Sequence, residues 1–280
     1  MGTELLGTVA GLRRYPVKSM LGEDLPACGV TERGLDGDRG LALVDRGTGK
    51  VGSAKNPRLW RRLLTLAAAS GPCVKITFPD GTVRASTDPG IDAALSEFLG
   101  REVTLASEPP PGAELDRAVP DEVLRDGVEA RVRSEIVRIA AGSPAGTFFD
   151  FAPLHLITTS TLGRVAAFSP RGTVEPERYR PNLIIATPGT GFTENDWAGH
   201  DLRIGSDLVI RVVARSPRCA IPTLEHGGLA RDTQALRVPA ARNRISPREG
   251  AGPEPCAGVY AQVIRPGRVQ AGDGVRLLTA

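Results

Sequence analysis

The 280-residue sequence lacks the features that mark exported and membrane proteins. Its first residues have neither the basic segment nor the apolar core of a signal peptide, and no apolar run approaches membrane-spanning length. We therefore expect a soluble, cytoplasmic protein with no membrane partner. The formal net charge of +3 is too small to indicate a nucleic-acid partner, although the cations could gather in one anion-binding cleft.

Cysteine and histidine are scarce, and their spacing excludes the common metal motifs. None of the four cysteines forms a C-x-x-C pair, which argues against a zinc ribbon, an iron–sulfur cluster or a thioredoxin-type site. So few cysteines also argue against a disulfide framework. Cys28 and Cys73 follow turns, and we expect them to be small buried hydrophobes. The three histidines have no H-x-x-x-H spacing, so we assign none of them to a metal.

The remaining composition is that of a globular protein, and turn residues divide it into two blocks. Residues 1–106 contain many short strands between Gly/Pro turns, which favours a β-barrel or a sandwich. Residues 107–146 begin with a Pro-rich break and are weakly patterned, so we expect a linker or a variable excursion. Residues 147–280 form the second block. The strands expected in the first block cover 5–17, 40–45, 62–69, 74–78, 82–85 and 102–106.

Helices are expected to be few, which makes the fold class mainly β with some α. Residues 91–99 have apolar side chains at helical spacing, with Gly100 as the stop. A second short helix follows Thr159 and Ser160, either of which could be its N-cap. The Pro/Ala/Arg-rich stretch 237–255 is expected to be a surface excursion or a mobile loop. The strands expected in the second block cover 182–186, 201–204, 207–214 and 258–264, with a strand pair around a tight turn at the end.

The segment Ser216–Thr223 sets one cysteine beside an arginine and between two prolines, directly after a strand-like run. Proline fixes its own φ and restricts the residue before it, so the loop is stiff. The neighbouring Arg218 favours the thiolate of Cys219, the form that binds metals and attacks electrophiles. We therefore expect Cys219 to be a functional cysteine.

Cations and polar groups stand at several other strand ends. Lys18 and Ser19 end the first strand and Arg39 precedes the next, so the two cations could clamp a phosphate. Lys18 could also form a Schiff base with pyridoxal phosphate, but no Gly-rich phosphate loop or pyridinium partner supports that idea. Arg180 and Asn182 could bind an anion and the edge of a heterocycle. Each group could instead be a solvated surface residue.

Together these segments resemble the MOSC family, named for the C-terminal domain of molybdenum cofactor sulfurases, and its companion N-terminal β-barrel. The resemblance covers about residues 4–106 and 147–278 and implies two β-barrel domains, the second with peripheral helices. The motifs that carry it are Tyr15–Ser19, Glu32–Leu35 with Asp38–Arg39, Arg180–Asn182, Arg218–Thr223 and Gly258–Tyr260.

By architecture, the most similar members are the amidoxime-reducing molybdenum enzymes and their bacterial homologues. The resemblance implies molybdenum cofactor (Mo-molybdopterin) binding, with Cys219 as the catalytic residue and metal ligand. It implies an oxidoreductase that reduces small N-hydroxylated or N-oxide substrates by oxygen-atom transfer to molybdenum. A separate electron-donor protein is implied, because no cluster-type cysteine spacing is present. The implied cofactor-binding residues are Lys18, Ser19, Arg39, Thr159, Ser160, Arg180, Asn182 and Arg218.

Two other functions remain open. The chain could be a molybdenum cofactor or sulfur carrier, in which Cys219 holds a persulfide or a transient metal without turnover. It could also be a MOSC-fold protein that has lost the cofactor and binds another anion. In addition, residues 224–228 differ from the acidic, threonine-containing turn of relatives, which concerns the contacts to substrate.

Overall fold

The computed structural model describes residues 3–278, and its secondary structure is mainly β, as predicted. The strands are β1 (Thr3–Arg14), β2 (Glu23–Leu25), β3 (Ala27–Thr31), β4 (Gly34–Leu35), β5 (Ala42–Asp45), β6 (Ala67–Ala69), β7 (Lys75–Thr77), β8 (Val83–Ala85), β9 (Val103–Ala106), β10 (Glu114–Ala118), β11 (Ser134–Arg138), β12 (Leu154–Thr158), β13 (Leu183–Ala186), β14 (Asp201–Ile204), β15 (Leu208–Pro217), β16 (Arg244–Ile245), β17 (Glu254–Arg265), β18 (Gly267–Gln270) and β19 (Gly274–Leu278).

Five α-helices and four short 3-10 helices lie around these strands within residues 3–278. None of these helices is both long enough and apolar enough to cross a bilayer. The helices are α1 (Pro57–Trp60), α2 (Ile91–Leu99), α3 (Pro120–Asp126), α4 (Thr159–Phe168), α5 (Gln234–Arg242), η1 (Arg61–Thr65), η2 (Pro176–Tyr179), η3 (Thr193–Trp197) and η4 (Ile221–Thr223).

Seven strands close into a barrel, in the order β12-β13-β1-β19-β14-β15-β17, and β17 pairs back to β12. All neighbours are antiparallel except β12 and β13, which are parallel. Alternate side chains of these strands point inward and form the largest core cluster, with Leu154, Leu183, Ile210 and Val259 fully buried. The expected mainly β class with a barrel is therefore confirmed.

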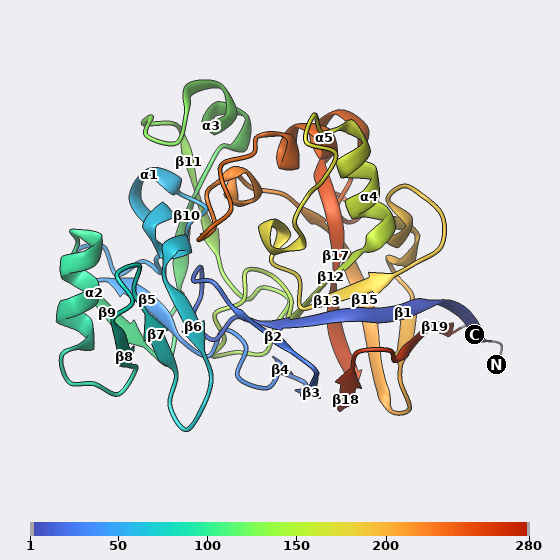
Figure 1. Ribbon diagram of the computed structural model, residues 1–280, viewed down its shortest axis with the longest axis horizontal. Coiled ribbons are helices and arrows are strands. Elements are labelled where there is room, and N and C mark those ends of the chain that lie inside the picture. The colour runs from blue at the N-terminus through green and yellow to red at the C-terminus, as the bar shows by residue number, and fades with distance from the viewer. Residues whose placement is uncertain (1–2, 279–280) are drawn as a thin grey trace.

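The N-terminal strand belongs to this barrel rather than to the block that follows it in sequence. β1 lies between β13 and β19, with Thr8 opposite Ala186 and Thr3 opposite Leu278. In Figure 1, β1 starts and β19 ends at the same edge of the molecule. Closing the barrel with the first strand ties residues 3–14 to the second block.

The segment from β5 to β9 forms a separate lobe beside the barrel (Figure 1), whereas β2 pairs with β1 and β3 pairs with β18. The lobe contains the β6-β7-β8 sheet and the β5–β9 pair, covered by α2. α2 buries Ile91 and Leu95 and ends at Gly100, which adopts the left-handed conformation at φ 65°. This helix and its stop are as predicted. The prediction of a strand over 62–69 is wrong in its first half, because this part forms the 3-10 helix η1, which buries Leu63 and Leu64.

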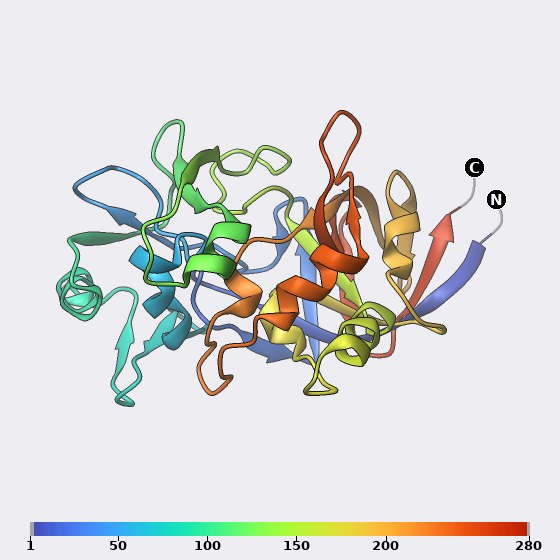
Figure 2. The ribbon, with the colours of Figure 1, turned by 90° about the horizontal axis from the view of Figure 1, so that it is seen from above.

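Two segments expected to be irregular contain regular structure. Residues 107–146 form the β10–β11 hairpin and α3, which buries Val123. Figure 2 shows α3 between the lobe and α5. In the stretch 237–255, the loop alternative is wrong for the first half, since α5 and β16 occupy it and α5 buries Leu236 and Val238. Proline and arginine hide the helical spacing of that segment.

Candidate functional site

A cavity of about 310 Å³ is lined by residues of the lobe, the barrel and the β10–β11 hairpin. Lys18 and Ser19 follow β1, Cys219 follows β15, and Arg138 comes from the hairpin. The cavity brings together seven of the nine site residues that the sequence suggests: Lys18, Ser19, Arg39, Arg180, Asn182, Arg218 and Cys219. Residues more than 200 positions apart therefore share one surface.

Positive charge dominates the cavity wall. Nine cationic side chains line it against only two carboxylates, those of Asp150 and Glu254. Such an excess in a concave site attracts ligands that carry more than one negative charge. The cations are Lys18, Arg39, Lys55, Arg117, Arg138, Arg180, Arg215, Arg218 and Arg248.

Asp150 holds two of these cations at the floor. Lys18 Nζ donates to Asp150 Oδ1 at 2.6 Å and to the carbonyl of Phe148 at 2.7 Å, and Lys55 Nζ lies 3.2 Å from Asp150 Oδ2. Burial alone would raise the pKa of Asp150, but Lys18 and Lys55 bring it well below its usual value. Burial lowers the pKa of Lys18 to about 8 despite that carboxylate. The ammonium group of Lys18 therefore loses its proton at about pH 8.

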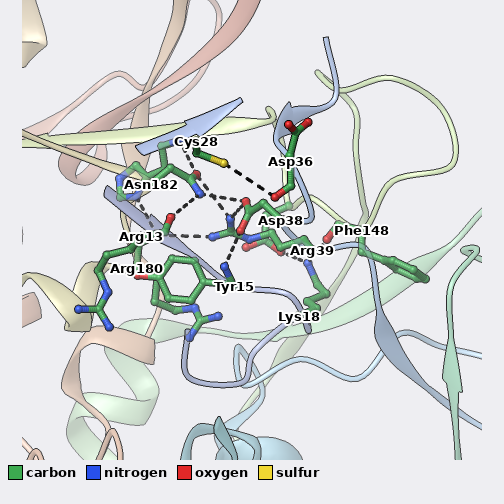
Figure 3. Close-up of polar contacts among 12 residues, drawn as sticks. Arg13, Tyr15, Lys18, Cys28, Asp36, Asp38, Arg39, Phe148, Arg180 and Asn182 are labelled. Atoms are coloured by element: carbon green, nitrogen blue, oxygen red, sulfur yellow. Dashed lines mark hydrogen bonds and ion pairs between the residues drawn. The ribbon is translucent and has the colours of Figure 1, made fainter. Parts of the chain in front are cut away.

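Asp38 is the centre of a second buried network (Figure 3). Its carboxylate accepts the backbone N–H of Tyr15 at 2.7 Å and the Nδ2 of Asn182 at 2.9 Å, and it pairs with Arg39. The Oδ1 of Asn182 accepts the N–H of His155 at 3.1 Å. Since protein groups engage this amide, Asn182 acts on the cavity by positioning Arg39 and His155.

Arg180 is a buried cation whose guanidinium has no counter-charge. Among residues 3–278, no carboxylate lies within ion-pair distance of it, and one of its terminal nitrogens is buried without a hydrogen-bond partner. The group lies 4.3 Å above the ring of Tyr15. Burial lowers its pKa to about 10. A buried, unpaired guanidinium is costly unless a ligand completes it, so Arg180 is the best placed anion-binding group of the cavity.

Backbone strain concentrates at this site. Four non-glycine residues among 3–278 have positive φ, and three of them line the cavity: Ser19 at 65°, Arg39 at 48° and Arg180 at 55°. The fourth, Ala140 at 59°, is next to the lining residue Ala141. Such conformations cost free energy and cluster where a ligand is held.

Cys219 lies between the end of β15 and η4, and it is 6% exposed at the cavity wall. The guanidinium of Arg218 donates to His155 Nε2 at 3.2 Å, to Ser216 Oγ at 2.6 Å and to the Tyr179 carbonyl at 2.9 Å. Arg218 therefore fixes the loop that carries the thiol.

Two cations that the sequence did not single out, Lys55 and Arg117, interact electrostatically with the thiol of Cys219. Burial would lower the pKa of Lys55, but Asp150, Tyr260 and Cys219 raise it. Burial would also lower the pKa of Arg117, while Glu254 and Cys219 raise it. Both cations thus lie within electrostatic range of the sulfur.

His155 is buried, as its apolar surroundings in sequence suggest, yet it forms part of the wall. Burial and the nearby charge of Arg218 lower its pKa well below the usual value, so the ring is neutral. Its Nε2 accepts from Arg218, and its Nδ1 lies 3.4 Å from the carbonyl of Arg180, to which it donates. The neutral ring links the two arginines.

Thr159 and Ser160 do not line the cavity. Ser160 Oγ bonds to Thr158 and Thr193, and Thr159 Oγ1 accepts the N–H of Thr187 at 3.2 Å. The N-cap of α4 is Thr158, whose hydroxyl accepts the N–H of Thr161 at 3.1 Å, so the expected cap at Thr159 or Ser160 is wrong. These hydroxyls stabilise the junction of β12 and α4.

Protein side chains alone do not make a metal centre here. Within the described residues 3–278, no group of three or more His, Cys, Asp or Glu side chains is arranged to hold an ion. A metal at Cys219 therefore needs its remaining ligands from a bound group, as a pterin dithiolene would provide.

Comparisons with known proteins match residues 144–276 to the MOSC domain and residues 6–98 to the MOSC N-terminal beta barrel domain. No curated protein matches the chain. Among solved structures, the chain is similar to the YUAD protein from Bacillus subtilis, with 10% identity, a TM-score of 0.46, and coverage of 99% of this chain and 97% of that one. It is also similar to YiiM from Escherichia coli, with 17% identity, a TM-score of 0.32, and coverage of 46% of this chain and 55% of that one.

Proposed function

The chain belongs to the MOSC family, with a MOSC domain preceded by its N-terminal β-barrel domain, and on that premise we propose that it is a molybdenum cofactor-binding oxidoreductase. Its substrates are N-hydroxylated or N-oxide compounds. MOSC domains bind the molybdenum cofactor in related proteins. The observation that carries the proposal is a cysteine thiol on the wall of a cavity with nine cations and two carboxylates.

The residues present fit such a cofactor. Cys219 offers one soft sulfur ligand, which suits a metal whose other sulfur ligands belong to the pterin. Arg180 offers a buried guanidinium with an unpartnered nitrogen, which a phosphate oxygen would satisfy. Lys18 and Arg39 add charge from the neighbouring floor of the cavity.

The protein groups bind, orient and shield. Arg180 and Lys18 bind the phosphate, and the Asp38–Asn182 contact holds Arg39 in its place. Arg218 and neutral His155 fix the loop of Cys219, so that the sulfur faces the cavity in one orientation. The bound cofactor supplies two-electron oxygen-atom transfer. The reduction of an N–OH group consumes two electrons and two protons and releases water, and we propose that a separate donor protein supplies the electrons.

Metal and pterin content test the first part of this proposal, and turnover tests the second. Protein purified from a host that makes the cofactor should contain molybdenum and pterin, and it should reduce benzamidoxime with reduced viologen as donor. Cofactor content without turnover would support the carrier function instead. Absence of both metal and pterin would contradict cofactor binding altogether.

A further inference from the structure

Two cations at the rim of the cavity are unpaired. Arg138 ends β11 and Arg248 lies in the loop between β16 and β17, and both are exposed and line the cavity. Among residues 3–278, no carboxylate lies within ion-pair distance of either one. Glu114 is opposite Arg138 in the hairpin, but the two side chains form no ion pair. The rim therefore keeps its positive charge.

Most cations deeper in the cavity already have partners. Arg39 pairs with Asp38, Lys18 and Lys55 share Asp150, and Arg117 donates to Glu254 at 2.8 Å. Arg215 and Arg218 donate to neutral acceptors, and the proposed cofactor phosphate uses Arg180. Arg138 and Arg248 thus add positive charge outside the proposed phosphate site.

An aromatic wall stands beside this rim. The guanidinium of Arg248 lies 5.4 Å from the ring centre of Phe151, and the rings of Phe151 and Tyr260 are 5.7 Å apart. All three line the cavity. Flat aromatic faces next to a cation suit a planar ring that carries a negative substituent.

The β10–β11 hairpin connects this rim to the surroundings of the thiol. Arg117 is within electrostatic range of Cys219 and stands on β10, the strand paired with the one that ends in Arg138. The hairpin therefore leads from the surroundings of the sulfur outward to the rim.

We propose that the substrate is a planar N-hydroxylated compound with a carboxylate or phosphate substituent. Arg138 and Arg248 bind the anionic group, and Phe151 and Tyr260 contact the ring. This inference rests on the proposed function and names the substrate class of the same site. A guanidinium can donate two parallel hydrogen bonds to either a carboxylate or a phosphate. The experiment therefore includes a substrate of each kind.

The test compares benzamidoxime with 4-carboxybenzamidoxime and 4-phosphonooxybenzamidoxime, with reduced viologen as donor. We expect the wild type to prefer an anionic substrate in kcat/KM, and the phosphate-to-carboxylate ratio identifies the better group. In the double variant Arg138→Gln/Arg248→Gln, the ratio of anionic to neutral kcat/KM should fall about tenfold, as expected for two partly exposed charge contacts. The matched control is Arg268→Gln, an exposed arginine on β18 outside the cavity.

A binding measurement keeps this inference separate from the proposed activity. Calorimetric titration without an electron donor should give tighter binding of the carboxylated compound than of benzamidoxime, and the difference should shrink with added salt and in the double variant. Turnover of benzamidoxime with equal kcat/KM for all three compounds would overturn the anionic substrate while leaving the reductase proposal intact. Charge-dependent binding without any turnover would support the rim site and contradict the reductase.

Discussion

The side-chain amide of Asn182 donates to the buried carboxylate of Asp38 at 2.9 Å, across 144 positions of sequence. Asp38 follows β4, whereas Asn182 precedes β13 of the barrel. Because Asp38 also pairs with Arg39, and Asn182 also receives the N–H of His155, one contact aligns two sides of the cavity. The position of Arg39 thus depends on the Asp38–Asn182 hydrogen bond, which does not itself need to touch a ligand.

Removal of the Asp38–Asn182 hydrogen bond should destabilise the protein. In Asn182→Ala, the carboxylate of Asp38 loses one donor and the N–H of His155 loses its acceptor, both in buried positions. We expect the free energy of unfolding to fall by about 2 kcal/mol, measured by urea denaturation. Asn56→Ala is the control, because the Asn56 side chain makes no cap hydrogen bond. Equal stability of the two variants would contradict the structural role of Asn182.

Gly258 should tolerate no side chain. A Cβ at this position would lie 2.4 Å from His155 Nε2 and 2.5 Å from the carbonyl oxygen of Leu156, and its φ is 81°. Gly272 has a similar φ of 90° but no atom within 4 Å of its Cβ position. Gly258→Ala should therefore lose about 3 kcal/mol or more, whereas Gly272→Ala should lose about 1 kcal/mol from backbone strain alone. Thermal denaturation of both variants checks this, and similar losses would contradict the crowding.

Anion binding should weaken as the pH rises through about 8. The pKa of Lys18 is lowered to about 8, so its charge disappears above that pH while the arginines stay protonated. Sulfate binding to cofactor-free protein, measured by calorimetry between pH 7 and 9.5, should lose up to about tenfold in affinity per pH unit above 8. Lys18→Arg keeps its charge and should flatten the profile. A flat profile in the wild type would contradict the role of Lys18.

Acid should destabilise the fold through His226. This ring is buried, and its Nδ1 lies 3.0 Å from the carbonyl of Leu224, to which it donates as a neutral ring. Burial lowers its pKa to about 4. The unfolded chain takes up the proton first as the pH falls from about 6.5 to 4, so stability decreases over that window by about 3 kcal/mol. Denaturation of His226→Asn, which keeps a donor for Leu224, should show a shallower loss; equal slopes would refute the assignment.

Local patterns in the sequence were sufficient for part of the site. Lys18, Arg39 and Cys219 stand near strand ends or in a stiff loop, and the fold brings them to one cavity. The strand periodicity of 207–214 and the glycine stop of 91–99 are likewise local. These features depend on neighbours in sequence, which is why they could be predicted.

The rest depends on contacts between distant segments. Lys55 and Asp150 have no local motif and become a pair with Lys18 only in the fold. The rim cation Arg138 lies in a weakly patterned segment expected to be a linker or a variable excursion. Arg248 lies in the Pro/Ala/Arg-rich stretch expected to be a surface excursion or a mobile loop. Thr159 and Ser160 match a family pattern, but here their hydroxyls bond to neighbouring side chains and backbone.

The central claim is that the sulfur of Cys219 holds a molybdenum cofactor, and metal analysis of purified protein tests it most directly. We expect wild-type protein and Cys28→Ser, a buried cysteine outside the cavity, to contain molybdenum and pterin in similar amounts. Cys219→Ser should keep its fold and lose about nine-tenths of the molybdenum, because a hydroxyl is a poor substitute for a thiolate ligand. Wild-type protein without molybdenum, or a Cys219→Ser variant that retains it fully, would contradict the account.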